Sequence, residues 1–443
     1  MREYKISKYC LPFKARDKGH YVYLSRDNSL YTVSKDTFEK ISRVREKPGE
    51  ISDLPKSLLG ELIENKILTT DDDEKEFYMQ MQMDYLLESF SSNKLILTIA
   101  PTSQCNFDCP YCFEENKPTV RMSDQVISNL ISFIRNFRNI EYLYLTWYGG
   151  EPLLAIELIA TILERIHSEI PQVKIAYHFL VTNGYLVNDK VVQVFKKFPL
   201  NEIQITLDGS RERHNLLRRL KGTEKGTYDK IIRNIGKLLE LMPKTQVSIR
   251  VNIDRDNADD YILVKDYLMN IFNGDPTLFV YPGILRIEDK ERKCMGCPSL
   301  SHADIQSFYF QINDQVNFYP RIISKGCSAT HINSFLIGPK GELYKCWNEL
   351  GDTDKIIGFI DQKDLDNKRL VRDYVLASSC FQDEVCKECE ILPICSGGCA
   401  YYRIKNKFEG GRFDVCSLYK GKGVLERCLI EHLHQAEEKE YEG

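Results

Sequence analysis

The chain of 443 residues lacks the features that mark several large classes of protein. It has no run near the roughly 18 apolar residues of a membrane span, and its start, MREYKISKYC, contains no apolar signal segment. Basic residues are not in excess, because 60 Lys and Arg face 64 Asp and Glu and the formal charge is −4. A mildly acidic chain offers no electrostatic surface for duplex nucleic acid or anionic membrane. We therefore expect a cytoplasmic protein without nucleic-acid or membrane partners.

Cysteine, in contrast, is abundant, with 15 residues in the chain. Cytosolic thiols stay reduced, so a dense set there indicates metal binding more than disulfides. Ten of the 15 fall in two groups, and the other five are scattered. The first group is Cys105, Cys109 and Cys112, and the second is Cys327, Cys346, Cys386, Cys389, Cys395, Cys399 and Cys416.

Short apolar runs alternate with amphipathic stretches through the middle of the chain. This alternation predicts parallel βαβ units. Six strands fit either an open doubly wound sheet or an incomplete (β/α) barrel, and both folds place chemistry at the carboxyl ends of the strands. The expected strands are 95–101, 142–148, 175–182, 202–207, 247–253 and 277–283. The expected helices are 123–138, 155–169, 188–198, 227–242 and 257–272.

Residues 1–90 predict a separate, winged-helix-like module. Two strands are expected at 20–25 and 29–34, and helices near 35–45 and 55–65. A free sheet edge in such a module can accept an extended peptide as an added strand. A capping subdomain without a partner is the alternative.

The first cysteine group lies a few residues after the first strand of the middle region. Three thiolates spaced as Cys105, Cys109 and Cys112 can bind three irons of a four-iron cluster and leave the fourth iron open. A structural zinc site is the alternative, but it needs four closed ligands, and no fourth Cys or His is near in the sequence.

This CxxxCxxC spacing resembles the signature of the radical S-adenosylmethionine (SAM) superfamily, which follows the first strand of a partial barrel. The segment Trp147–Pro152 (WYGGEP) resembles the family's GGEP motif, and 205–218 resembles its LDG segment. The resemblance implies a SAM cofactor whose binding residues are Tyr111 (adenine), Gly149, Gly150, Glu151 and Pro152 (GGEP, with Glu151 near the methionine ammonium), Asn183 and Thr206 (ribose side) and Arg218 (methionine carboxylate). Arg219 is an alternative to Arg218. The role of Asp208 is undecided, because this residue could belong to the SAM site or cap a turn.

The second cysteine group resembles the SPASM domain, which carries two auxiliary four-iron clusters. The resemblance implies one cluster on Cys386, Cys389, Cys395 and Cys416, and another on Cys327, Cys346 and Cys399. The fourth ligand of the latter stays undecided between an open site, Cys294 and Cys297, because the segment after Cys327 offers His331 but no thiol. A zinc ribbon is the alternative for the whole group. Cys10, Cys380 and Cys428 match nothing and are expected to be free.

Together these features predict an α/β fold: a partial (β/α)6 TIM-like barrel at 91–290, between the winged-helix-like module at 1–90 and an iron–sulfur SPASM domain at 291–443. The resemblance implies three [4Fe-4S] clusters and an electron donor such as flavodoxin or ferredoxin. It also implies that a 5′-deoxyadenosyl radical from SAM abstracts a hydrogen atom from the substrate.

SPASM proteins include sulfatase-maturating enzymes and maturases of ribosomally made peptides. The former place an Asp after the cysteine that matches Cys346, where this chain has Trp347, which cannot act as a base. The module at 1–90 resembles a leader-peptide recognition element. We therefore expect a peptide maturase that forms a thioether from a Cys sulfur to a carbon. The alternatives are carbon–carbon or carbon–oxygen cross-linking, sulfatase maturation, and a non-catalytic iron–sulfur or zinc scaffold.

Overall fold

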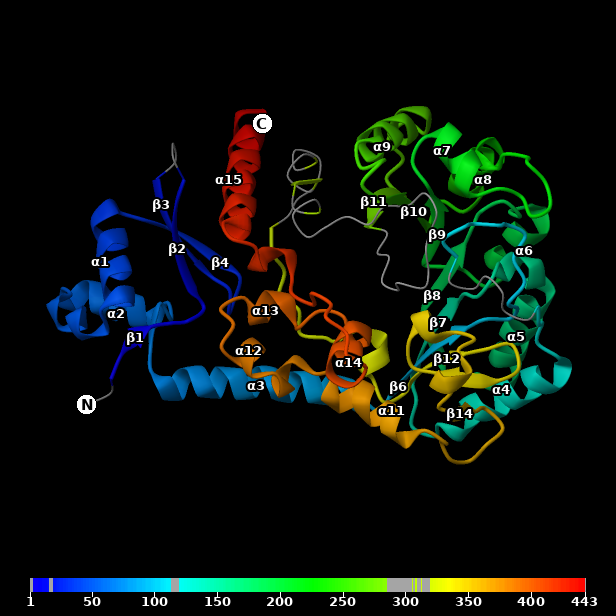
Figure 1. Cartoon of the computed structure of the whole chain (residues 1–443), viewed down its shortest axis with the longest axis horizontal. Helices are drawn as coiled ribbons and strands as arrows, with labels where there is room; N and C mark the ends of the chain where they lie inside the picture. The colour runs from blue at the N-terminus through cyan, green and yellow to red at the C-terminus, as the bar shows by residue number, and fades with distance from the viewer. Residues whose placement is uncertain are drawn as a thin grey trace. The chain divides into compact units, whose positions relative to one another are not determined.

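The computed structural model describes residues 3–15, 19–112, 119–284, 305, 307–308, 312 and 319–442. The chain divides into two compact units, each assembled from segments that are far apart in the sequence (Figure 1). The first unit comprises Met1–Phe90, Tyr309–Ile332 and Arg372–Gly443, and the second comprises Ser91–Phe308 and Asn333–Val371.

A nine-stranded sheet with the order β11-β10-β9-β8-β7-β6-β12-β13-β14 forms the second unit. Strands β6 to β11 are parallel, and each pairs with its neighbour in sequence. A doubly wound sheet reverses its strand order at a switch point, and the described strands β6 to β11 show no reversal. The unit is therefore an incomplete barrel, which confirms the predicted α/β fold. The strands are β6 (Lys94–Ile99), β7 (Tyr142–Trp147), β8 (Lys174–Thr182), β9 (Glu202–Leu207), β10 (Gln246–Ile253) and β11 (Leu278–Ile284).

Helices connect these strands and match the predicted ranges within three residues. Their apolar positions recur every three or four residues, as Ile127, Leu130 and Ile134 of α4 illustrate. The Ser123 side chain caps α4 by accepting from Val126 N. The predicted helices are α4 (Asp124–Asn136), α5 (Ile156–Glu169), α6 (Asp189–Lys197), α8 (Tyr228–Leu241) and α9 (Asp260–Ile271), and α7 (Arg211–Leu217) adds to them.

The two faces of the parallel sheet differ in polarity because successive side chains of a strand point to opposite faces. In β9, Ile203 and Ile205 are buried, and helices line one face of the sheet (Figure 1). Glu202, Gln204 and Thr206 alternate with them and stay partly exposed. The sheet thus presents a polar face opposite the helices, and the polar residues at its carboxyl edge are those that a bound molecule can reach.

Residues 333–371 extend this sheet beyond β6. Strand β12 (Ser334–Ile337) pairs with β6 in parallel, and β13 (Glu342–Tyr344) and β14 (Gly358–Phe359) follow in antiparallel pairing. The sequence division at 290/291 placed these residues in the C-terminal domain. The structure instead unites them with the barrel, because the apolar β12 satisfies the free edge of β6 with backbone hydrogen bonds.

The N-terminal part of the first unit contains both strands and both helices expected there. It is built from β1 (Lys5–Ile6), β2 (Cys10–Ala15), β3 (Gly19–Leu24), β4 (Ser29–Val33), α1 (Lys35–Glu46), α2 (Lys56–Glu64), β5 (Leu68–Thr69) and α3 (Asp71–Ser89). Strand β2 was not predicted, since Pro12 is unusual in a strand. Helix α3 was not predicted either. Its acidic first turn suits a helix N-terminus, and Thr70 and Asp73 form a capping box.

The C-terminal cysteines of the first unit lie on helices, most of them short, and on loops. The helices are α11 (Lys368–Arg372), which crosses the division between the units, α12 (Glu384–Lys387), α13 (Leu392–Cys395), α14 (Ala400–Phe408) and α15 (Val424–Glu442). Among the helices of the described ranges, none has the length and apolarity to cross a membrane.

Candidate functional site

The three thiols of the first cysteine group lie in the loop after β6. Cys105 Sγ accepts a hydrogen bond from Phe107 N at 3.4 Å, and Cys112 N donates to Cys109 O at 3.1 Å. Burial, with smaller contributions from Asp208, Cys112 and Cys105, raises the pKa of Cys109 to about 12 against the opposite effect of Arg218. This mutual influence shows that the loop gathers the three thiols.

The WYGGEP loop after β7 is bound directly to this cysteine loop. Gly150 N donates to Thr102 O at 3.2 Å, and Glu151 N donates to Gln104 O at 2.7 Å. Gly149 has a φ of +104°, and a Cβ there would lie 2.5 Å from Thr102 O. A side chain at either glycine would separate the two loops, so both glycines are needed for the close approach.

Glu151 is 1% exposed and makes its hydrogen bonds inside the protein. Its carboxylate accepts from Thr182 Oγ1 at 2.7 Å, from Asn183 N at 2.8 Å and from Leu153 N at 3.0 Å. Burial raises the pKa of Glu151, and these hydrogen bonds act in the opposite direction. The carboxylate thus ties the end of β8 to the WYGGEP loop, and its predicted contact with a methionine ammonium stays a prediction.

Tyr111, Asp208, Arg218 and Asn252 form a hydrogen-bonded cluster at the carboxyl ends of β9 and β10. Tyr111 Oη donates to the Asp208 carboxylate and accepts from Arg218 Nη1 at 2.9 Å. Asn252 Nδ2 donates to Asp208 Oδ1 at 3.0 Å, and Arg218 Nη1 lies 3.8 Å from the same oxygen. Asp208 and Arg218 are therefore members of this buried cluster, and the contacts with SAM that were predicted for Tyr111 and Arg218 stay predictions.

Three polar atoms in this region are buried without a hydrogen-bond partner: Asn106 Nδ2, Arg218 Nε and Asn252 Oδ1. Such atoms are costly unless a bound group satisfies them. Arg218 and Asn252 both contact Tyr111. Asn106 is linked to the residues around Glu151, because its Oδ1 accepts from Asn183 Nδ2 at 2.8 Å. Two donors and an acceptor beside three thiols fit a polar, charged ligand such as SAM next to an iron–sulfur cluster.

The remaining predicted SAM residues lie on the same elements. Thr206 is on the polar face of β9, opposite Arg250 of β10 in the register. Pro152 is buried at the first position of a short 3-10 turn after Glu151. Sequence reasoning missed Asn252, although its polar side chain alternates with apolar neighbours in β10, a pattern that could have revealed it.

His214 lies in the segment 205–218 and is a second residue to which the sequence assigned no role. It is fully buried, its Nδ1 accepts from Asp208 N at 3.3 Å, and its Nε2 lies 3.0 Å from Thr227 Oγ1. Burial, with a smaller effect of Arg218, lowers the pKa of His214 well below its usual value. A neutral imidazole thus supports the backbone at Asp208.

The structure brings four cysteines of the second group together. Burial raises the pKa of Cys416, and Cys395 and Cys386 contribute to the rise. Lys420 Nζ donates to Cys389 Sγ at 3.4 Å, and its own pKa is raised by Cys389, Cys416 and Cys386 against the effect of burial. These four thiols are the ones predicted to share a cluster.

Cys380 lies close to the same thiols, which the sequence did not indicate. Burial raises its pKa to about 12, with contributions from Cys386 and Cys395. The other two unmatched cysteines, Cys10 and Cys428, are buried, and burial raises their pKa values to about 12 and about 11.

The other predicted cluster is represented only in part. Burial raises the pKa of Cys327, and Cys399 contributes, so these two thiols of the first unit are neighbours. Cys346 belongs to the second unit. Cys294 and Cys297 lie outside the described residues. The grouping of Cys327, Cys346 and Cys399 therefore stays a prediction.

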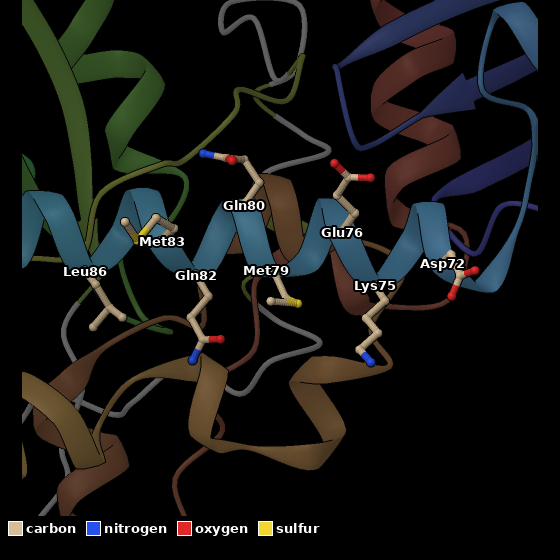
Figure 2. Close-up of a pocket in the computed structure, with 8 residues that line it drawn as sticks. All are labelled: Asp72, Lys75, Glu76, Met79, Gln80, Gln82, Met83 and Leu86. Atoms are coloured by element: carbon tan, nitrogen blue, oxygen red, sulfur yellow. The ribbon is translucent and has the colours of Figure 1, made fainter.

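Across the described ranges, no three His, Cys, Asp or Glu side chains are grouped so as to hold a single metal ion. In a four-iron cluster each thiolate binds a different iron. A cluster site therefore requires thiols spread around a larger volume rather than gathered around one point. A hollow beside α3 has no cysteine in its lining (Figure 2). It is lined by Asp72, Lys75, Glu76, Met79, Gln80, Gln82, Met83 and Leu86.

Comparison with known proteins agrees with this geometry. A family model described as the radical SAM superfamily matches residues 99–268. A cysteine-type anaerobic sulfatase-maturating enzyme from Clostridium novyi is 26% identical over 362 residues, which are 74% of this chain and 93% of the relative.

Solved structures show the same fold. Native anSMEcpe with bound AdoMet and Cp18Cys peptide aligns with a TM-score of 0.58 at 20% identity, over 77% of this chain and 99% of that chain. Streptococcus suis SuiB bound to S-adenosylmethionine aligns with a TM-score of 0.53 at 15% identity, over 93% of this chain and 100% of that chain. SuiB bound to precursor peptide SuiA covers 94% of this chain, with a TM-score of 0.50 at 14% identity. Residues 99–268, which contain the thiols Cys105, Cys109 and Cys112, therefore match the radical SAM superfamily.

Proposed function

We propose that this chain is a radical SAM maturase that modifies a ribosomally made precursor peptide. The observation that carries the proposal is the set of unsatisfied buried polar atoms of Asn106, Arg218 and Asn252 beside three gathered thiols. SAM and four-iron clusters, when bound, supply one-electron chemistry that side chains cannot supply. The chain's own contribution is to bind and orient them at the carboxyl edge of the sheet and to exclude water.

A peptide substrate is supported by the relatives. The Clostridium novyi relative is named a sulfatase-maturating enzyme, and the aligned structures of anSMEcpe and SuiB hold a peptide and a precursor peptide. SuiB aligns over 93% of this chain, whereas anSMEcpe aligns over 77%. The greater coverage by a protein that binds a precursor peptide supports the maturase reading.

Sulfatase maturation is the second candidate, and Trp347 argues against it. The indole Nε1 donates to Thr98 Oγ1 at 3.0 Å, and the ring lies 4.8 Å from that of Tyr148. Trp347 thus lies near the ends of β6 and β7. It occupies the sequence position where sulfatase-maturating enzymes are expected to have an Asp that acts as a base. An indole has no acceptor for a proton, so this position offers no general base.

The partner in this proposal is the leader segment of the precursor, bound by residues 1–90. Within the described residues β4 pairs with β3 alone, so one edge of the three-stranded sheet β2-β3-β4 has no strand beside it. An extended peptide can add there through main-chain hydrogen bonds. A flavodoxin or ferredoxin is the proposed electron donor.

We further propose a thioether as the product, formed from a peptide Cys sulfur to a carbon whose hydrogen atom the 5′-deoxyadenosyl radical would take; the thiol proton would pass to solvent and the remaining electron to an auxiliary cluster. The predicted cluster of Cys327, Cys346 and Cys399 offers three thiolates, and a fourth, open iron suits a substrate thiolate. Carbon–carbon and carbon–oxygen cross-links are the competing products.

The test is anaerobic reconstitution followed by iron analysis and a product assay. About 12 irons per chain, from three four-iron clusters, and 5′-deoxyadenosine release from SAM are expected. Incubation with a precursor peptide should then consume one alkylatable peptide thiol per product. A product with every thiol free would exclude the thioether. A reconstituted protein that neither binds iron nor cleaves SAM would instead indicate a non-catalytic scaffold.

A further inference from the structure

Arg403 joins three segments of the first unit at the predicted cluster of Cys386, Cys389, Cys395 and Cys416. It lies on α14, one turn after Cys399. Its Nε donates to Gly397 O at 2.5 Å, its Nη1 to Asp383 Oδ2 at 2.8 Å and its Nη2 to Cys386 Sγ at 2.8 Å. All three nitrogens of the guanidinium are therefore committed, and one of them to a thiol.

Asp383 extends this arrangement to the turn that carries Cys386. Its Oδ1 accepts from Val385 N at 3.0 Å and from Cys386 N at 3.4 Å, as the N-cap of α12. Its other oxygen pairs with Arg403, whose side chain is 10% exposed. The position of the Cys386 sulfur is thus held both through its own backbone and by a direct hydrogen bond.

A second cation contacts the same group of thiols. Lys420 Nζ donates to Cys389 Sγ at 3.4 Å. Asp383 offsets part of the charge of Arg403, but the described contacts of Lys420 include no carboxylate. Two of the four thiols therefore receive a hydrogen bond from a cationic side chain. A neutral backbone donor would supply the hydrogen bond but not the positive charge.

We propose that Arg403 is a positioning residue that holds Cys386 for the cluster and, with Lys420, makes that cluster easier to reduce. This rests on the proposed function, since it requires a cluster on these four thiols. Uptake of one electron adds one negative charge, and hydrogen bonds to the ligating sulfurs stabilise the more negative state. The cluster is thereby suited to accept an electron.

A purely structural clamp would not need the bond to sulfur. The contacts with Asp383 and Gly397 already join α14 to α12 and to the loop 396–399. The third bond is directed at a ligating atom, where it affects the metal group rather than the fold. The reduction potential therefore separates the two interpretations.

The experiment compares Arg403→Gln with wild type and with Arg412→Gln in the full-length, reconstituted protein. Arg412 is exposed and has no described bond to a thiol, so its variant removes the same charge from the same region. Iron is counted, and each cluster is titrated by EPR against a series of redox potentials. We expect about 12 irons and one of three transitions moved to lower potential in Arg403→Gln, with a several-fold smaller reduced fraction at the wild-type midpoint.

Unmoved transitions in Arg403→Gln with full iron would overturn the inference and leave the proposed function intact. An equal shift in Arg412→Gln would overturn it as well, since it would indicate general charge rather than the bond. Loss of one cluster, to about eight irons, in Arg403→Gln alone would support the positioning role, and the potential is then measured in Lys420→Gln, which removes the other cationic hydrogen bond. A cluster at wild-type potential there would refute the tuning by cationic hydrogen bonds. About four irons in wild type would show that the proposed function itself fails at these cysteines.

Discussion

Asp208 illustrates at the residue scale how one buried carboxylate organises the candidate site. Tyr111 and Asn252 donate to it, and Arg218 balances its charge. Burial raises the pKa of Asp208, while Arg218, Tyr111 and Asn252 lower it. The cation next to the carboxylate therefore makes the buried charge tolerable, and neither partner is stable there without the other.

Replacing Asp208 by Asn should destabilise the protein by about 3 kcal/mol, because Arg218 would be left buried without its anion. The matched control is Asp189→Asn, which breaks the exposed ion pair with Lys237 and should cost under about 1 kcal/mol. Urea denaturation of the two variants and of wild type measures the difference. Equal losses in the two variants would refute the role of Asp208 as the counter-charge of Arg218.

At the scale of elements, strands β7 and β8 are joined by a buried hydrogen bond between side chains. Trp147 Nε1 donates to His178 Nε2 at 2.8 Å, and His178 Nδ1 lies 3.1 Å from Pro199 O. An imidazole that accepts at Nε2 and donates at Nδ1 is neutral. Burial lowers the pKa of His178 to about 4 from 6.5, which agrees with this assignment.

The pairing makes stability depend on pH. Between pH 6.5 and about 4 the unfolded chain protonates His178 and the folded chain does not, so stability falls as pH falls through this range. By pH 5 the loss should be about 2 kcal/mol relative to pH 7.5. His178→Gln should remove that part of the slope. Parallel curves of unfolding free energy against pH for wild type and variant would contradict the prediction.

The loop after α13 shows a second effect at this scale. Ser396, Gly397 and Gly398 all have positive φ, of 50°, 80° and 74°. A Cβ at Gly398 would overlap Val415 O. This loop thus requires glycine so that the segment with Cys416 can approach Cys395 and Cys399.

At the scale of the whole molecule, the N-terminal sheet β2-β3-β4 is buried on both faces within the first unit. Cys10, Val22 and Leu24 pack on one face with Ile41 of α1 and Leu62 of α2. The alternate residues of the strands pack on the other face with α13 and α15. These are Leu11, Phe13, Tyr21 and Tyr23, against Ile391, Ile394, Leu425 and Leu429. The module at 1–90 and the C-terminal cysteine segment therefore share one core.

This shared core predicts that a change in α15 weakens the N-terminal sheet. Leu429→Ala should cost about 2–5 kcal/mol, because it leaves a cavity in that core, and should increase hydrogen exchange of the β2 and β3 amides. Leu87→Ala, at a leucine that is 60% exposed on α3, is the control and should leave exchange unchanged. Protected β2 and β3 amides in Leu429→Ala would show that the two segments are stable independently.

The sequence by itself determined the strand–helix alternation of the barrel and the spacing of the cysteines. Both depend on short-range patterns, because the apolar period and a ligand interval are visible within a few residues. This is why β6 to β11 and the loop of Cys105 to Cys112 agree with the prediction. Helix α3 and β12 were missed, since an acidic start and a four-residue apolar run are ambiguous locally.

Only the tertiary structure decided which distant residues meet. Tyr111 and Asn252 are 141 positions apart, and no local sequence pattern around either residue predicts their contact. Their contact joins the loop after β6 to β9 and β10, although these strands lie three and four positions from β6 in the sheet. The same holds for the bond of Arg403 to Cys386 and for the pairing of β12 with β6. Such contacts arise because packing and backbone pairing select one arrangement among many that the local patterns allow.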